Sequence, residues 1–314
     1  MLHTELFAGL LWSVPPGYLS HSIALKQFSD TRTQVPVWSA ECFFNRTMTF
    51  KKSDNCAEST KWFSHFSRRS MTALHVSRRV SIQLTAKELE IVTKSIQQFQ
   101  LGEGSRGQRL LDRGRKFGRS VSDPYFAEAL DLFIREEQQH SRYLDAFMES
   151  QSIPLVSRHW VDTIFRRLRG LAGLELSLTV LATAEIIAVP YYRALRCATG
   201  SAILKMICTR ILEDEANHLK YQASMLARVS FGRPSVFQRA LSEMHKLFLQ
   251  GTLFVVWREH RAVLEAGNYD FHRFHKEAIL EFFNWDYTRR TAAAAIPTAR
   301  RLIVRNSGRV EPHV

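Results

Sequence analysis

Two short motifs, each a glutamate followed three residues later by a histidine, lie in the middle of apolar helical stretches of this sequence. They are Glu137–His140 and Glu215–His218. Residues three apart on an α-helix share one face about one turn apart, so both side chains of a motif can bind the same metal ion. Charge inside an apolar stripe is costly unless it is paired or bound to a metal, and this cost restricts the folds open to the chain.

The apolar stripes around the motifs have the alternating spacing of three and four residues that is typical of helix bundles. The first stripe continues to Leu144 and the second to Met225. Two further stripes each contain one glutamate, Glu103 upstream of the motifs and Glu185 between them. The sequence therefore predicts an all-α fold in which four helices direct four carboxylates and two imidazoles into one core.

In the order of these residues the chain resembles the ferritin-like di-iron carboxylate proteins, which include rubrerythrins, bacterioferritins and bacterial multicomponent monooxygenases. Such bundles hold two metals with a glutamate from each of two helices and a Glu-x-x-His pair from each of the other two. The resemblance covers roughly residues 84–230. It implies a ferritin-like four-helix bundle, in which the long gap between Glu137 and Glu185 contains the crossover connection.

The resemblance also implies a role for each polar residue of the stripes. The implied metal ligands are Glu103, Glu137, His140, Glu185, Glu215 and His218. Glu137 and Glu215 would bridge two metals, the other two glutamates would be terminal ligands, and each histidine would give one nitrogen to one ion. Glu136 and Asp214 directly precede the motifs and would orient the ligand histidines from behind.

Four carboxylates and two imidazoles make a hard, oxygen-rich ligand set. This set favours two iron ions over structural zinc, which prefers a closed tetrahedral site that often includes thiolates. Manganese, alone or paired with iron, has the same ligand preference and stays an alternative. A metal-free core is disfavoured, because converging carboxylates without a cation repel one another and lose their hydration.

The function that the sequence favours is a non-haem di-iron oxidoreductase, which uses O2 to oxidise or hydroxylate an unidentified organic substrate. The chain has no Cys-x-x-Cys motif, so the electrons are expected from a separate donor. Three alternatives stay open: a ferroxidase or other iron-handling protein, a peroxide-reducing protein of the rubrerythrin type, and a metal-free scaffold for protein interactions.

Outside the expected bundle the sequence divides into segments of different character. Residues 1–80 show no helical periodicity and are interpreted as a leader, either disordered or upstream of a true start at Met71. Residues 234–290 predict two aromatic-rich helices that pack on the bundle or form the face of a homodimer. Residues 291–314 form a basic tail.

The net charge of +13 raises the question of a nucleic-acid partner. The arginines gather near the two ends of the chain and the sequence contains no recognised nucleic-acid motif, so no nucleic-acid partner is expected. The four cysteines lack metal-type spacing, which indicates reduced thiols and a cytoplasmic protein. Leu171–Tyr192 is the most apolar stretch, but Glu185 lies within it and favours a bundle helix over a membrane span.

Overall fold

The protein is all-helical, as the sequence predicts. A computed structural model describes residues 54–79, 81, 83–159 and 173–296, and no strand occurs among them. These residues belong to the compact unit Phe50–Val314. The helices in chain order are α1 (Asp54–Ser70), α2 (Ala86–Glu103), α3 (Gln108–Ser120), α4 (Tyr125–Ser150), α6 (Leu174–Ala198), α7 (Ala202–Val229), α8 (Ser235–Ala266) and α9 (Phe271–Ala295).

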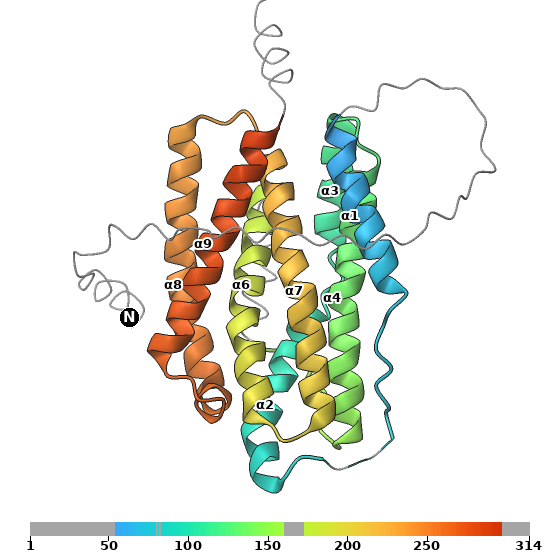
Figure 1. The fold of residues 1–314 in the computed structure, drawn as a ribbon, viewed down its shortest axis with the longest axis vertical. Coiled ribbons are helices and arrows are strands. Elements are labelled where there is room, and N and C mark those ends of the chain that lie inside the picture. The colour runs from blue at the N-terminus through green and yellow to red at the C-terminus, as the bar shows by residue number, and fades with distance from the viewer. Residues whose placement is uncertain (1–53, 80, 82, 160–172, 297–314) are drawn as a thin grey trace, which may run out of the picture. The chain divides into compact units, whose positions relative to one another are not determined.

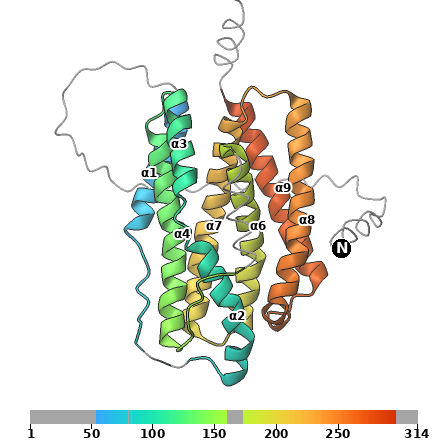
Figure 2. The same cartoon turned by 180° about the vertical axis from the view of Figure 1, so that it is seen from behind.

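The helices α2, α4, α6 and α7 carry the acidic residues of the four stripes. Helix α6 packs along α7, α4 contacts both α2 and α7, and α1 and α3 pack on α4. Figures 1 and 2 show α6 and α7 in the middle, with α4 on one side and α8 and α9 on the other. This arrangement buries the facing sides of α4, α6 and α7, where the stripe residues point.

The start of α2 is fixed by a capping box that also ties it to a distant turn. The Thr85 hydroxyl accepts a hydrogen bond from the Glu88 amide, and the Glu88 carboxylate accepts one from the Thr85 amide. The same carboxylate accepts a hydrogen bond from the Gly200 amide, between α6 and α7. The bonds from Gly200 and Thr85 lower the pKa of Glu88 to about 2. This anchor sets the position of α2, and therefore of Glu103 at its far end.

The turn from α2 to α3 requires glycine. Gly107 has a φ of 59°, in the left-handed region that side chains with a Cβ rarely adopt. A Cβ at this position would also lie 2.7 Å from Cδ1 of Ile134 on α4. The tight turn therefore brings the end of α2 and the start of α3 close to α4, beside the first Glu-x-x-His motif.

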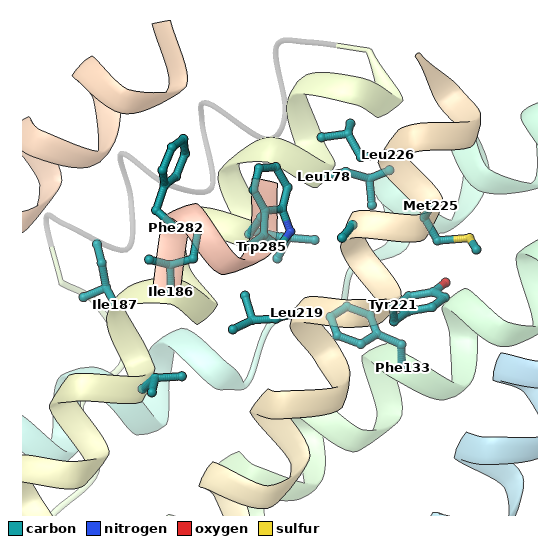
Figure 3. Packing of buried hydrophobic residues seen from close by; sticks show 14 of the residues in the cluster. Phe133, Leu178, Ile186, Ile187, Leu219, Tyr221, Met225, Leu226, Phe282 and Trp285 are labelled. Carbon is teal, nitrogen blue, oxygen red and sulfur yellow. The ribbon is translucent and has the colours of Figure 1, made fainter. Parts of the chain in front are cut away.

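The core beside the central helices is formed by large apolar side chains. Figure 3 shows residues of α4, α6, α7 and α9 pointing into a shared interior, among them Phe133, Ile186, Tyr221 and Phe282. These four side chains are fully buried. Each large apolar side chain taken out of water stabilises the fold by about 1.5–3 kcal/mol. These side chains therefore supply packing that holds the central helices together.

Helix α1 is the main departure from the expected organisation. The absence of helical periodicity inferred for residues 1–80 is wrong for residues 54–70, which form a helix packed along α4. Trp62 and Phe66 are 5% and 2% exposed in this contact. The apolar face of this helix is hard to recognise in the sequence, because its few large apolar residues are separated by Ser, Lys and Arg. Residues 1–53 of the proposed leader lie outside the described residues, and residues 71–79 follow the helix without regular secondary structure.

The two aromatic-rich C-terminal helices form as predicted. Helices α8 and α9 pack mainly on α6 and α7, and Phe274 and Trp285 are buried there. Phe254 and Phe283 point outward and are about half exposed. A homodimer through this face stays a prediction. Most of the expected basic tail, from residue 297 onward, lies outside the described residues.

Among the described helices, α6 alone is long and apolar enough by composition to cross a membrane. In its most apolar window, 78% of the residues are buried inside the protein. Core helices of soluble proteins show the same composition when they are covered on several sides, and α6 contacts α3, α7, α8 and α9. Packing inside the protein is therefore sufficient to account for the apolar character of this helix.

Candidate metal centre

Both Glu-x-x-His motifs lie on helices and meet between α4 and α7. Glu137 and His140 come from α4, and Glu215 and His218 come from α7. One ligand atom from each of the four residues lies within 4.8 Å of those of the other three. Both histidines and Glu215 are completely buried. These four residues can hold a metal ion, as the shared spacing of the two motifs predicts.

Each imidazole directs its Nδ1 atom at carboxylates of both helices. His218 Nδ1 lies 2.7 Å from Glu137 Oε1 and 3.4 Å from Glu215 Oε2. His140 Nδ1 lies 3.5 Å from Glu215 Oε1 and 3.9 Å from Glu137 Oε1. The two rings are 5.4 Å apart between their centroids. The cluster thus presents two nitrogen lone pairs and two carboxylates to a shared space.

Within the described part of the chain, the polar atoms that face this space have no hydrogen-bond partner apart from other predicted ligands. They are Glu137 Oε1, both carboxylate oxygens of Glu215, and the Nδ1 atoms of His140 and His218. Buried polar groups without a partner are rare in native proteins because each one costs free energy. A bound cation would satisfy all five atoms at once, so the residues fit the metal ions that their chemistry implies.

The opposite nitrogen of each imidazole is held by a carboxylate of the facing helix. His140 Nε2 lies 3.2 Å from Asp214 Oδ2, and His218 Nε2 lies 2.9 Å from Glu136 Oε2. This crossed pairing agrees with the expectation that the acids preceding the motifs reach the neighbouring histidine. A carboxylate at Nε2 favours the tautomer that carries its proton there, which leaves the Nδ1 lone pair directed inward.

The charges of the cluster act on the protonation of His218. Burial by itself would lower its pKa, but the charges of Glu137 and Glu215 outweigh burial and hold the pKa well above its usual range. The pKa values of Glu137 and Glu215 rise because both groups are buried and because Glu185 adds negative charge nearby. The buried carboxyl groups therefore lie close enough to resist ionising together, and a bound cation would relieve this repulsion.

Glu185 and Glu103 lie beside this cluster, although each is also held by a neighbouring side chain. Glu185 is 3% exposed and accepts a hydrogen bond from Gln222 Nε2 at 3.0 Å. Glu103 accepts one from the Tyr192 hydroxyl at 2.8 Å. The pKa of Glu103 is raised, mainly because the group is buried and also because of the nearby charge of Glu185. The structure thus brings four of the six residues into one group, with Glu103 and Glu185 beside it, and the roles of all six as ligands stay predictions.

Sequence reasoning missed the arginine that stands behind the centre. Arg69, on α1, donates from Nε to Asp214 Oδ1 at 2.5 Å and from Nη2 to Glu213 at 3.1 Å. Its Nε also lies 4.0 Å from Glu136 Oε1. Arg210 donates to the other oxygen of Asp214 at 2.9 Å. The sequence signal for these contacts is weak, because Arg69 is one of several arginines in a segment without a clear apolar stripe.

These contacts keep Asp214 ionised. Burial would raise its pKa, but hydrogen bonds from His140 and Arg69, together with the charge of the imidazole, hold the pKa well below its usual range. Asp214 is 2% exposed, so its charge is shielded from water and acts on the imidazole at short range. The chain thus supplies a permanent anion behind His140.

Comparison with known proteins found no protein family that matches this chain, no similar curated protein and no similar solved structure.

Proposed function

We propose that the protein is a non-haem di-iron oxidoreductase in which α2, α4, α6 and α7 form a ferritin-like four-helix bundle. The observation that carries this proposal is the convergence of two carboxylates and two imidazoles whose facing atoms have no other partner within the described residues. Two more glutamates border the same space, and this inventory is that of di-metal carboxylate centres. Two bound iron ions would supply the electrons for reducing O2.

In this proposal Glu137 and Glu215 hold both ions, since each faces both imidazoles. His140 and His218 bind through Nδ1, the nitrogen that their outer carboxylates leave free. Glu103 is held by Tyr192 and Glu185 by Gln222. These hydrogen bonds orient the two remaining carboxylates and leave each one an oxygen for a terminal metal contact.

The protein surroundings suit redox chemistry on an organic molecule. The histidines and Glu215 are completely buried, which excludes bulk water from the centre. Asp214 and Glu136 contact the Nε2 atoms of the two imidazoles, so the rings would keep their orientation during turnover. Electrons would come from a separate donor, because the chain has no Cys-x-x-Cys motif that would suggest a rubredoxin-like centre.

The test is metal analysis of the full chain, followed by optical spectra of the reduced protein before and after addition of O2. We expect two irons per chain and a ferric absorbance that appears with O2. The Glu137→Ala variant should fail to bind the two irons, because Glu137 would contact both of them. Glu128→Ala is the matched control, since Glu128 lies on the same helix and is exposed. A wild-type protein that holds no metal after anaerobic loading would refute the proposal.

The two other iron-based functions are separated by the same preparation. A ferroxidase would oxidise and store many more irons than two per chain, and a peroxide-reducing protein would react faster with H2O2 than with O2. A manganese or mixed pair would appear directly in the metal analysis.

A further inference from the structure

A cavity of about 140 Å³ lies directly beside the proposed metal centre, between α2, α6 and α8. Glu103, Glu137 and Glu185 line it on the side of the centre. A molecule that occupied this cavity would therefore lie against the carboxylates of the site. Residues of α8 form another part of the lining, so a helix that carries none of the six predicted ligands takes part in shaping this space.

The other cavity walls are mainly apolar, and small residues create the space. Helix α6 contributes Ala184 and Ala188, and α2 contributes Gly102 beside Phe99. Ala184 is partly exposed although its neighbours on α6 are buried, because it faces the cavity. Helix α8 contributes Val256 together with residues one turn before and after it. Larger side chains at the alanine positions would fill the volume.

The polar groups on the α8 side are already engaged by the protein. His260 Nδ1 lies 2.8 Å from the Ser95 hydroxyl, and burial lowers the pKa of His260 to about 3, so the imidazole is neutral. The Thr252 hydroxyl donates to the carbonyl of Phe248. Each of these groups therefore has a partner inside the protein and does not depend on a ligand for one.

The charge of the described lining residues bears on which ligands the cavity accepts. No lysine or arginine lines it among the residues the structure describes, and His159 lies 3.8 Å from Glu259. A carboxylate or phosphate would lose its hydration in this space without gaining a lysine or arginine partner among the described lining residues. An apolar cavity of about 150 Å³ in another protein is known to bind benzene, so this volume suits one ring.

We propose that this cavity is the substrate chamber of the protein and that it accepts an uncharged ring the size of benzene. The assignment as substrate rests on the proposed function. The preference for a neutral ring rests on the volume and the apolar walls, and it can be measured without turnover. A ring in this chamber would lie against Glu103, Glu137 and Glu185, which are part of its lining.

The experiment is a fluorine NMR titration of the full chain with fluorobenzene and with 4-fluorobenzoate, two ligands of nearly the same shape and different charge. We expect fluorobenzene to saturate a single site and 4-fluorobenzoate to bind at least about tenfold more weakly. Ala184→Leu fills the chamber and should weaken fluorobenzene binding by about tenfold or more. Ala294→Leu, an exposed alanine on α9 outside the cavity lining, is the matched control and should bind like the wild type.

Thr252→Leu fills the same chamber from α8 and decides the question if Ala184→Leu does not fold by circular dichroism. Absence of saturable fluorobenzene binding to the wild type would overturn the proposal. So would unchanged binding in a folded filling variant, or equal affinity for the two ligands. Iron binding without ring binding would refute only the chamber. Ring binding to a chain that takes up no metal would instead refute the oxidoreductase, and the cavity would remain a binding site for neutral rings.

Discussion

Arg69 on α1 donates a hydrogen bond to Asp214 on α7, although the two residues are 145 positions apart in the chain. Asp214 in turn contacts His140 on α4. A single chain of contacts therefore joins three helices and ends at a proposed metal ligand. Since guanidinium–carboxylate bonds are charge-assisted and directional, Arg69 fixes the position of Asp214 more firmly than packing would. Helix α1 is thus part of the architecture behind the centre.

Replacing Arg69 should slow the chemistry of the centre while leaving it formed. Arg69→Ala removes the bond to Asp214, although Arg210 still holds the other oxygen. Changes behind metal ligands typically cost about 10–100-fold in affinity or activity. We expect a loss in that range in the rate of ferric absorbance formation, measured by stopped-flow mixing with O2, with retained iron. Arg68→Ala, at an exposed neighbouring position, is the control. Equal rates in both variants would show that Arg69 acts only in packing.

Changing Asp214 should have a graded effect. Asp214→Asn keeps the size and some hydrogen bonding but removes the anion beside His140, so iron should be retained and should react more slowly with O2. Asp214→Leu also leaves the two arginines without their buried partner, and we expect this variant to react with O2 more slowly than Asp214→Asn. His140→Ala removes a proposed ligand and should be the most damaging. Stopped-flow rates that do not follow this order would show that the contact between Asp214 and His140 does not affect the reaction.

A protein that starts at Met71 should fold poorly. The sequence suggested that residues 1–70 are dispensable, but this truncation removes all of α1 and exposes the surface of α4 beneath it. Trp62 and Phe66 would be lost from the core. Truncating either to alanine in the full chain should cost about 3–5 kcal/mol in the free energy of unfolding. Denaturant unfolding measures this, with exposed Ser70→Ala as the control. A soluble, equally stable truncated protein would restore the leader interpretation.

The stability of the fold should fall on acidification because His245 is buried in its neutral form. Its ring bonds to the Thr183 hydroxyl and packs against Phe282 and Trp285. Burial lowers its pKa from 6.5 to about 4, although the charge of Asp286 opposes this. The unfolded chain therefore binds a proton that the folded protein does not, and stability is lost as the pH falls from about 6.5 to about 4.

This group should account for about 2 kcal/mol of the stability lost between pH 7 and pH 5. Urea unfolding of wild type and of His245→Gln at both pH values tests the prediction. Glutamine keeps a polar group near Thr183 but does not titrate, so its loss of stability should be smaller by about that amount. The same loss in both proteins would show that other groups cause the acid sensitivity.

The helices and the motifs were predictable because they depend on local periodicity. A buried charge at a stripe position, such as Glu215, is visible in the sequence because its neighbours three and four residues away are apolar. The partners of the site residues were not visible in this way. Arg69 and Tyr192 reach the centre through contacts between distant helices, and many arginines and several tyrosines in the sequence offer the same chemistry.

The chamber was unpredictable for a similar reason. Alanine and glycine at a helix position usually indicate close packing, and a single position gives no sign that an empty volume lies beside it. The small residues Gly102 on α2 and Ala184 and Ala188 on α6 line one space, and residues of α8 form another wall of it. Gly104 and Gly107, which follow Glu103 in the chain, line a different cavity that also reaches Glu103 and Glu137.

The crossed pairing of the two motifs has a consequence for how the centre assembles. Each helix supplies the carboxylate that holds the histidine of the other, so neither α4 nor α7 carries a complete half of the site. A slip of one helical turn, about 5.4 Å, between the helices would break both histidine–carboxylate pairs together. The two pairs therefore fix the register between α4 and α7, and a shifted register would remove the support of both histidines.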